Sequence, residues 1–125
     1  MSEWAHPAWP YLVGAALVGV LPRRALRPVL VVAPVAAVLV AWTLPVEARV
    51  EWRLMGHPLL WMSVDRLARV FAVIFALIGG LGAVYAWSSD SRRLHVSAFT
   101  AAAAAIGVSL AGDWVTLYLW WETLA

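Results

Sequence analysis

Charged residues are scarce in this 125-residue chain, and several residue types are missing altogether. Only 13% of its residues are charged and 64% are hydrophobic, whereas about a quarter of the residues in a soluble domain are charged. This composition excludes an ordinary water-soluble domain and predicts an integral membrane protein. Cysteine is absent, which excludes a disulfide framework and a thiolate metal site. Lysine is absent as well, so all nine basic residues are arginine.

Five apolar segments divide the chain, and each is expected to form a helix in the membrane, where a full span takes about 20 apolar residues. We therefore expect an all-α membrane protein with about five transmembrane helices in a single membrane domain, residues 1–125. The last helix is expected to be too short for a full span, so that a further segment or another chain must complete it. The expected helices cover residues 7–22, 26–44, 66–87, 94–111 and 114–125.

Residues 46–64 interrupt the helices with a different pattern. From Val46 to Leu54, apolar and charged residues alternate strictly, which is typical of a strand with one buried face. The sequence Gly56-His57-Pro58 predicts a turn. The segment is therefore expected to form a short extracytoplasmic β-hairpin that lies on the membrane surface, with its charged face in water.

The expected fourth helix has unusually little side-chain bulk. Its residues Ser97, Ala101, Ala105 and Ser109 repeat every four positions, which puts small side chains along one face of a helix. Small residues allow helices in a membrane to approach closely. We therefore expect this helix to be buried against the others.

Two short arginine-rich loops predict the orientation. The loops at residues 23–27 and 88–93 lie two spans apart, so both face the same side of the membrane. Short loops rich in arginine are typically cytoplasmic. The N-terminus and the hairpin are then expected on the extracytoplasmic side.

The last segment carries the main candidate functional residue, Glu122. Asp113 is a suitable N-cap for this helix, and Glu122 follows nine residues later, or about 13 Å along the axis. Glu122 would then lie near the middle of a hydrocarbon core about 30 Å thick, where an ionised carboxylate costs about 2.5 to 3.5 kcal/mol. Such residues usually handle ions or protons. A structural pair with a neighbouring helix is the alternative.

Three further residues are secondary candidates. Asp65 and Asp113 each precede an expected helix, so each is expected first as an N-cap. His95 lies near the cytoplasmic start of the fourth helix. A histidine pKa near neutrality suits proton transfer, although a lone histidine at a helix end is more often an interfacial residue. His6 and His57 lie in loops without metal-ligand spacing, and neither a metal nor a cofactor is expected.

The run from Ala111 to Ala125 resembles a known family. Its sequence, Ala-Gly-Asp-Trp-Val-Thr-Leu-Tyr-Leu-Trp-Trp-Glu-Thr-Leu-Ala, is similar to the start of the fifth transmembrane helix of antiporter-like membrane subunits. These subunits occur in respiratory complex I, in Mrp-type Na⁺/H⁺ antiporters and in membrane-bound hydrogenases. Glu122 matches the family's glutamate position, and Asp65 with Leu67 matches an Asp-x-Leu before the third helix. The order of helices and hairpin also agrees.

The resemblance implies that the chain is the N-terminal portion of a proton- or sodium-translocating subunit. In the family, the glutamate equivalent to Glu122 lies near a lysine on a later helix and modulates proton transfer along a water-filled axis. This chain has no lysine and no later helices, so it cannot complete a transport cycle alone. The implied partners are other membrane subunits, the lipid bilayer and H⁺ or Na⁺, with no nucleic acid.

The resemblance also implies a location and a host complex. The location is the plasma (inner) membrane of a bacterium or an archaeon, with several passes. The chain is not expected to be catalytic itself. The complex around it could be an NADH:quinone oxidoreductase or a hydrogenase that translocates protons.

Two other classes of protein remain open. One is a small multi-pass scaffold or assembly protein without transport activity; the reading frame downstream of the Ala125 codon would discriminate it from a transport subunit. The other is a membrane anchor for a redox enzyme. An anchor of that kind would hold haem between histidine pairs on facing helices, and the sequence shows no such pair.

Overall fold

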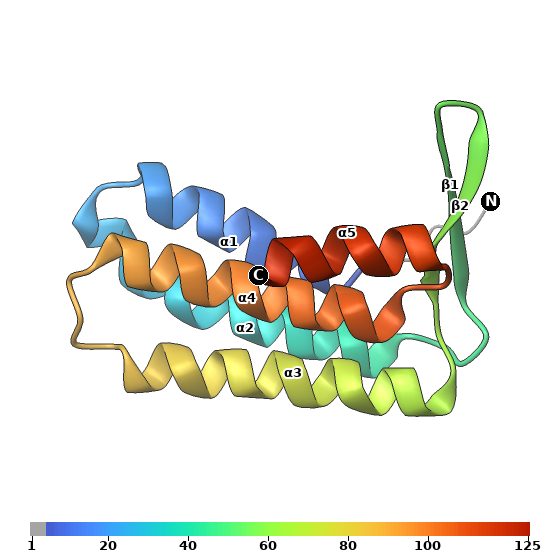
Figure 1. The fold of residues 1–125 in the computed structure, drawn as a ribbon. Helices are drawn as coiled ribbons and strands as arrows, with labels where there is room; N and C mark the ends of the chain where they lie inside the picture. Colours follow the sequence, from blue (N-terminus) through green and yellow to red (C-terminus); the bar gives the residue numbers. More distant parts are fainter. Residues whose placement is uncertain (1–4) are drawn as a thin grey trace.

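The computed structural model describes residues 5–125, which form five helices, a short 3-10 helix and one β-hairpin (Figure 1). In chain order the elements are α1 (Ala8–Val20), η1 (Arg23–Ala25), α2 (Leu26–Thr43), β1 (Arg49–Leu54), β2 (His57–Ser63), α3 (Arg66–Tyr85), α4 (Arg92–Leu110) and α5 (Trp114–Leu124).

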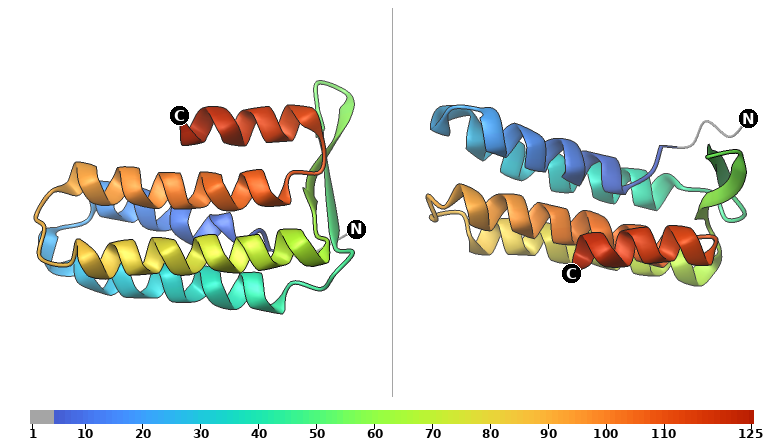
Figure 2. Two further views of the ribbon diagram at one scale, coloured as in Figure 1. Left: turned by 60° about the horizontal axis from the view of Figure 1, so that its bottom comes forward. Right: turned by 45° about the horizontal axis from the view of Figure 1, so that its top comes forward.

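Helices α1 to α4 form a ring around one core. Helix α1 packs against α2 and α4, and α3 packs against the same two helices. Helix α5 lies outside the ring and packs on α4 (Figure 2). The axes of the long helices are roughly parallel, and the chain runs back and forth between the two ends of the bundle (Figure 1). We call them the arginine end, with the loops at 21–25 and 86–91, and the hairpin end.

Three helical segments are long and apolar enough to cross a membrane. They are Arg23–Thr43, Arg66–Tyr85 and Arg92–Leu110. Helix α1 has 13 residues and α5 has 11, which gives about 20 Å and 16 Å of helix. The expected count of five transmembrane helices is therefore not confirmed, whereas the helical bundle supports the expectation of a membrane protein.

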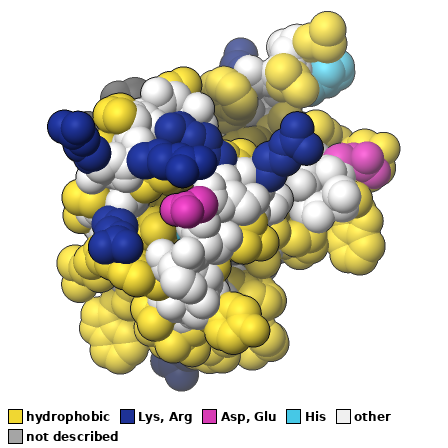
Figure 3. All heavy atoms as spheres, turned by 90° about the vertical axis from the view of Figure 1, so that its left-hand side faces the viewer, with side chains coloured by type: hydrophobic (Ala, Val, Ile, Leu, Met, Phe, Trp, Pro, Cys, Tyr) yellow, Lys and Arg dark blue, Asp and Glu magenta, His cyan; other side chains and the backbone are white. Residues whose placement is uncertain are grey.

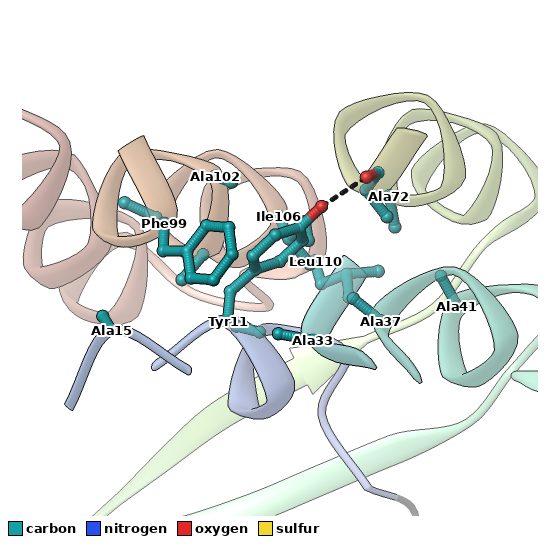
Figure 4. Packing of buried hydrophobic residues seen from close by; sticks show 14 of the residues in the cluster. Tyr11, Ala15, Ala33, Ala37, Ala41, Ala72, Phe99, Ala102, Ile106 and Leu110 are labelled. Carbon is teal, nitrogen blue, oxygen red and sulfur yellow. Dashed lines mark hydrogen bonds between the residues drawn. The ribbon is translucent and has the colours of Figure 1, made fainter. Parts of the chain in front are cut away.

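Tyr11 of α1 occupies the centre of the ring. Its side chain is fully buried, and its hydroxyl donates a hydrogen bond to the carbonyl oxygen of Ala76 in α3 at 2.5 Å (Figure 4). Its ring meets the edge of Phe99 in α4, with 5.2 Å between the ring centroids. Gly79 in α3 leaves room for the Tyr11 hydroxyl, which a Cβ at that position would contact at 2.5 Å. Tyr11 therefore joins three helices.

The expected hairpin is confirmed, but its turn differs from the predicted one. Strands β1 and β2 pair antiparallel, with Leu54 opposite His57. Met55 and Gly56 both have positive φ angles, 51° and 82°, as a tight two-residue hairpin turn requires. The turn therefore comes before His57 and Pro58, which belong to β2.

Helix α4 packs against other helices, as expected, but its small-residue stripe is not its most buried part. It contacts α1, α3 and α5. Its buried face includes Phe99, Ile106 and Leu110. In the predicted stripe, Ser97 is exposed and the other three residues are only half-buried. The side of α4 that is buried depends on how its side chains fit those of the neighbouring helices. The spacing of small residues in the sequence did not indicate that side.

Gly107 in α4 should be essential for the seating of α5. The Trp120 indole lies directly on Gly107, so that a Cβ there would overlap the ring. We expect Gly107→Ala to destabilise the chain by about 1–3 kcal/mol through overpacking. Gly82→Ala in α3 is the matched control, because a Cβ there meets nothing within 4 Å. Unfolding in detergent measures both, and equal effects would contradict the packing account.

Candidate functional site

Helix α5 is held in place by a set of hydrogen bonds around Asp113 that we call the Asp113 clasp. One carboxylate oxygen, Oδ1, accepts from the backbone N–H of Thr116 at 2.7 Å, which caps α5. The other oxygen, Oδ2, accepts from the backbone N–H of Leu60 in β2 at 2.5 Å. The N–H of Gly112 donates to the Leu60 carbonyl oxygen at 3.1 Å. The clasp therefore joins the start of α5 to the hairpin.

The charge of Asp113 is stabilised by these donors. Partial burial of the carboxylate works against ionisation and would raise the pKa. The N–H groups of Thr116 and Leu60 favour the ionised form and, with smaller contributions from the Thr116 hydroxyl and the Val115 N–H, hold the Asp113 pKa below its usual value. Asp113 is thus a cap, as expected, with a second role in tertiary structure that sequence alone did not indicate.

The face of α5 that meets the bundle carries Thr116 and Trp120. Both side chains are buried, and they lie four residues apart, on one side of the helix. The Trp120 indole N–H and the Thr116 hydroxyl make no well-formed hydrogen bond within residues 5–125, although that hydroxyl also faces the Asp113 carboxylate. Two buried polar groups therefore lie side by side at this contact.

Glu122 points away from the bundle. Its side chain is exposed, and it shares its side of α5 with Tyr118 and Leu119, which are also exposed. The five helices do not cover Glu122, because Trp120, two residues earlier, takes the inward position. The predicted place of Glu122 in the hydrocarbon core stays a prediction. Glu122 is a single carboxylate on an otherwise apolar outer face.

Asp65 caps α3, as expected. Its carboxylate accepts from the backbone N–H of Ala68 at 2.6 Å. Nearby, the Arg69 guanidinium donates to the carbonyl oxygen of Leu44 at 3.3 Å, and Leu44 is the residue that follows α2. A cation at that helix end also interacts favourably with the helix dipole. These contacts fix the ends of two helices and form no cluster with Glu122.

His95 and Arg92 lie at the arginine end. His95 is buried, and its Nε2 lies 3.0 Å from the carbonyl oxygen of Ser89, so that it closes the loop before α4. Arg92 donates to the carbonyl oxygens of Val18 and Leu21, at 3.0 and 2.7 Å. It thereby provides hydrogen-bond donors for free carbonyl groups at the C-terminal end of α1. Figure 3 shows arginine side chains gathered over this end.

The structure does not bring the predicted site residues together. Asp65 and Asp113 lie at the hairpin end, His95 lies at the arginine end, and Glu122 lies on the outer face of α5. Within residues 5–125, no hydrogen bond or ion pair joins any two of these four side chains. A proton or ion path between them would therefore need groups supplied from outside the described chain.

His6 belongs to a buried polar group that sequence reasoning missed. Only 3% of its surface is exposed, and its ring stacks on Trp120, with 5.3 Å between the centroids, and lies 6.3 Å from Trp61 of β2. Its Nδ1 accepts from the N–H of Ala8 at 3.1 Å, so the neutral ring carries its proton on Nε2. That atom has no partner within residues 5–125.

Burial keeps His6 neutral. It lowers the His6 pKa from the usual 6.5 to about 4, because the charged ring would lose its hydration. The contact with α5 joins residues more than a hundred positions apart, and no local pattern in the sequence could predict it. His6, Trp61 and Trp120 together tie α1, the hairpin and α5 to one another.

Comparisons with known proteins add no further constraint on the site. No protein-family model, curated protein or solved structure matches the chain. Among the residues that the structure describes, no group of three or more histidine, cysteine or acidic side chains could hold a metal ion.

The stability of the chain should fall as the pH falls from about 6.5 to 4. The folded state binds the His6 proton more weakly than the unfolded chain does, so this contribution is complete above pH 6.5 and is lost as the pH approaches 4, at a cost of about 3 kcal/mol. His6→Phe keeps a ring against Trp120 and should remove this pH dependence. His57→Phe, at the exposed start of β2, should retain it. Unfolding measured across this pH range tests both, and an unchanged pH profile in His6→Phe would contradict the assignment.

Proposed function

We propose that this chain is the N-terminal part of an antiporter-like subunit that translocates protons or sodium ions within a multi-subunit membrane complex. The complex would be of the Mrp antiporter, complex I or hydrogenase type, in the plasma membrane of a bacterium or an archaeon. Glu122 is the protonatable residue of this proposal. The arginine end would face the cytoplasm and the hairpin end the extracytoplasmic side.

One observation carries the proposal: Glu122 is a lone carboxylate on the apolar outer face of α5. Trp121, Tyr118 and Leu119 are exposed around it, and α5 runs alongside the membrane-length helix α4 (Figure 2). If α4 crosses the bilayer, Glu122 lies at the depth of the hydrocarbon core, where an ionised side chain is costly. Either the carboxylate binds a proton there or a cation lies nearby.

The surroundings of Glu122 favour a partner subunit over lipid as its neighbour. No cationic side chain in the described chain contacts it, whereas a basic group on a facing helix would stabilise the ionised form. Movement of that group, or of its charge, would then change the pKa of the carboxylate, so that Glu122 would take up or release a proton. This is the physical basis of the proposed transport role.

Replacement of Glu122 in the complete complex tests the proposal. We expect Glu122→Gln to reduce proton pumping or cation/proton exchange by about a hundredfold, because a glutamine cannot carry the proton. Glu51→Gln is the matched control, since it removes an exposed carboxylate of β1 and should leave transport unchanged. Assembly of each variant complex is verified by size-exclusion chromatography, and full transport by an assembled Glu122→Gln complex would exclude the proposal.

The second candidate is a scaffold or assembly protein without transport activity. Its support is the separation of the four predicted site residues, which share no hydrogen bond or ion pair within residues 5–125. In that case Glu122 would only pair with a partner helix. Glu122→Gln would then weaken assembly of the complex, whereas complexes that did assemble would transport normally.

A further inference from the structure

We propose that the projecting end of the hairpin, residues 51–58, is a lipid-surface anchor. In this arrangement it lies flat in the headgroup layer at the hairpin end of the bundle. Trp52 and Leu54 face the hydrocarbon, and Glu51 and Arg53 face water. The inference requires the helices to cross a bilayer but is independent of any transport role, so the two proposals can fail separately.

Trp52 and Leu54, the apolar side chains at the projecting end of β1, face the bundle. Trp52 lies on the same side of the hairpin as Trp61, because the two rings meet edge to face. Trp61 packs toward the bundle, with its ring centroid 5.2 Å from that of Trp120 in α5 and 6.3 Å from that of His6. Trp52 therefore faces the same direction, and so does Leu54, because alternate residues of a strand share a face.

The apolar face continues beyond the helices that it covers. Residues 51–58 are all exposed, and Figure 1 shows the hairpin crossing the ends of the helices and extending past α1 and α5. On this projecting part Trp52 is 60% exposed, Leu54 is 45% exposed and Met55, in the turn, is 94% exposed. Trp52 remains fixed by its edge contact with Trp61, at 5.6 Å between the centroids.

The geometry places this apolar surface at the depth of the lipid headgroups. The strands run roughly perpendicular to the helices (Figure 1), so they lie parallel to the plane of a membrane that the helices cross. Their apolar side faces in the direction of the helices, hence toward the bilayer. Tryptophan prefers the interface between hydrocarbon and water, and Glu51 and Arg53 on the opposite face keep their hydration.

A lipid surface fits these observations better than a protein partner does. The projecting end of the hairpin has apolar side chains on one face and charged side chains on the other. The membrane interface has the same two sides, with hydrocarbon on one and water on the other. The surface is also continuous with the part of the hairpin that already covers the bundle. The occupant to which we commit is therefore the lipid of the adjacent leaflet.

The absence of cysteine from the chain allows a direct test with single cysteine substitutions. Nitroxide labels at positions 51, 52, 53 and 54 are compared in the full chain, reconstituted into vesicles of phosphatidylcholine and phosphatidylglycerol. Oxygen, which concentrates in hydrocarbon, and a water-soluble nickel chelate are the two relaxing agents. We expect the oxygen-to-nickel accessibility ratio to be severalfold higher at 52 and 54 than at 51 and 53.

Two reference labels calibrate the measurement. Val32, exposed on the apolar surface of α2, is the lipid reference, and Ser88, exposed in the loop after α3, is the water reference. Circular dichroism verifies the helix content of each labelled chain. Equal ratios at the four positions, or nickel contact at 52 and 54 as strong as at Ser88, would overturn the proposal. Strong nickel contact at 52 and 54 is also the result expected if a protein partner normally covers this face, since the vesicles contain this chain alone.

Discussion

The carboxylate of Asp113 is the contact on which the position of α5 depends. Helix α5 is short and packs on α4 and on strand β2. Asp113 binds the N–H groups of Thr116 and Leu60 and thereby joins the helix to β2 at a fixed point. The bond to Leu60 is charge-assisted, and such bonds are about twice as strong as neutral ones. From that point the helix geometry determines that Trp120 faces inward and Glu122 outward.

The sequence predicted the features that local chemistry determines. The alternation from Val46 to Leu54 indicated the hairpin, and the side chains of Asp65 and Asp113 indicated where two helices begin. In each case the deciding interaction lies within a few residues of the chain. Every expected helix also begins and ends within two residues of the observed one, because apolar composition and flanking polar loops set these limits.

The packing of the helices against one another depends on contacts between segments that are distant in the sequence, and the sequence did not predict it. Hydrophobicity does not reveal which side of a membrane helix faces its neighbours, because every side is apolar. The sequence therefore did not indicate that α4 buries Phe99, Ile106 and Leu110 more deeply than its small-residue stripe, nor that Glu122 lies on the outer face of α5. His6 lies in a loop, as predicted, but its packing against Trp61 and Trp120 was not predicted. The close fit of Trp120 on Gly107 explains why α5 presents its tryptophan, and not its glutamate, to the bundle.

Hydrogen exchange in an Asp113→Ala variant is the most direct test of this account. The account predicts that backbone amides of α5 and the Leu60 amide lose protection, whereas those of α2 and α3, which make no contact with the clasp, retain it. Asp90→Ala, in the exposed loop at the arginine end, should leave every helix protected. Unchanged protection of α5 in Asp113→Ala would contradict the central claim that this carboxylate holds the helix, and with it Glu122, in place.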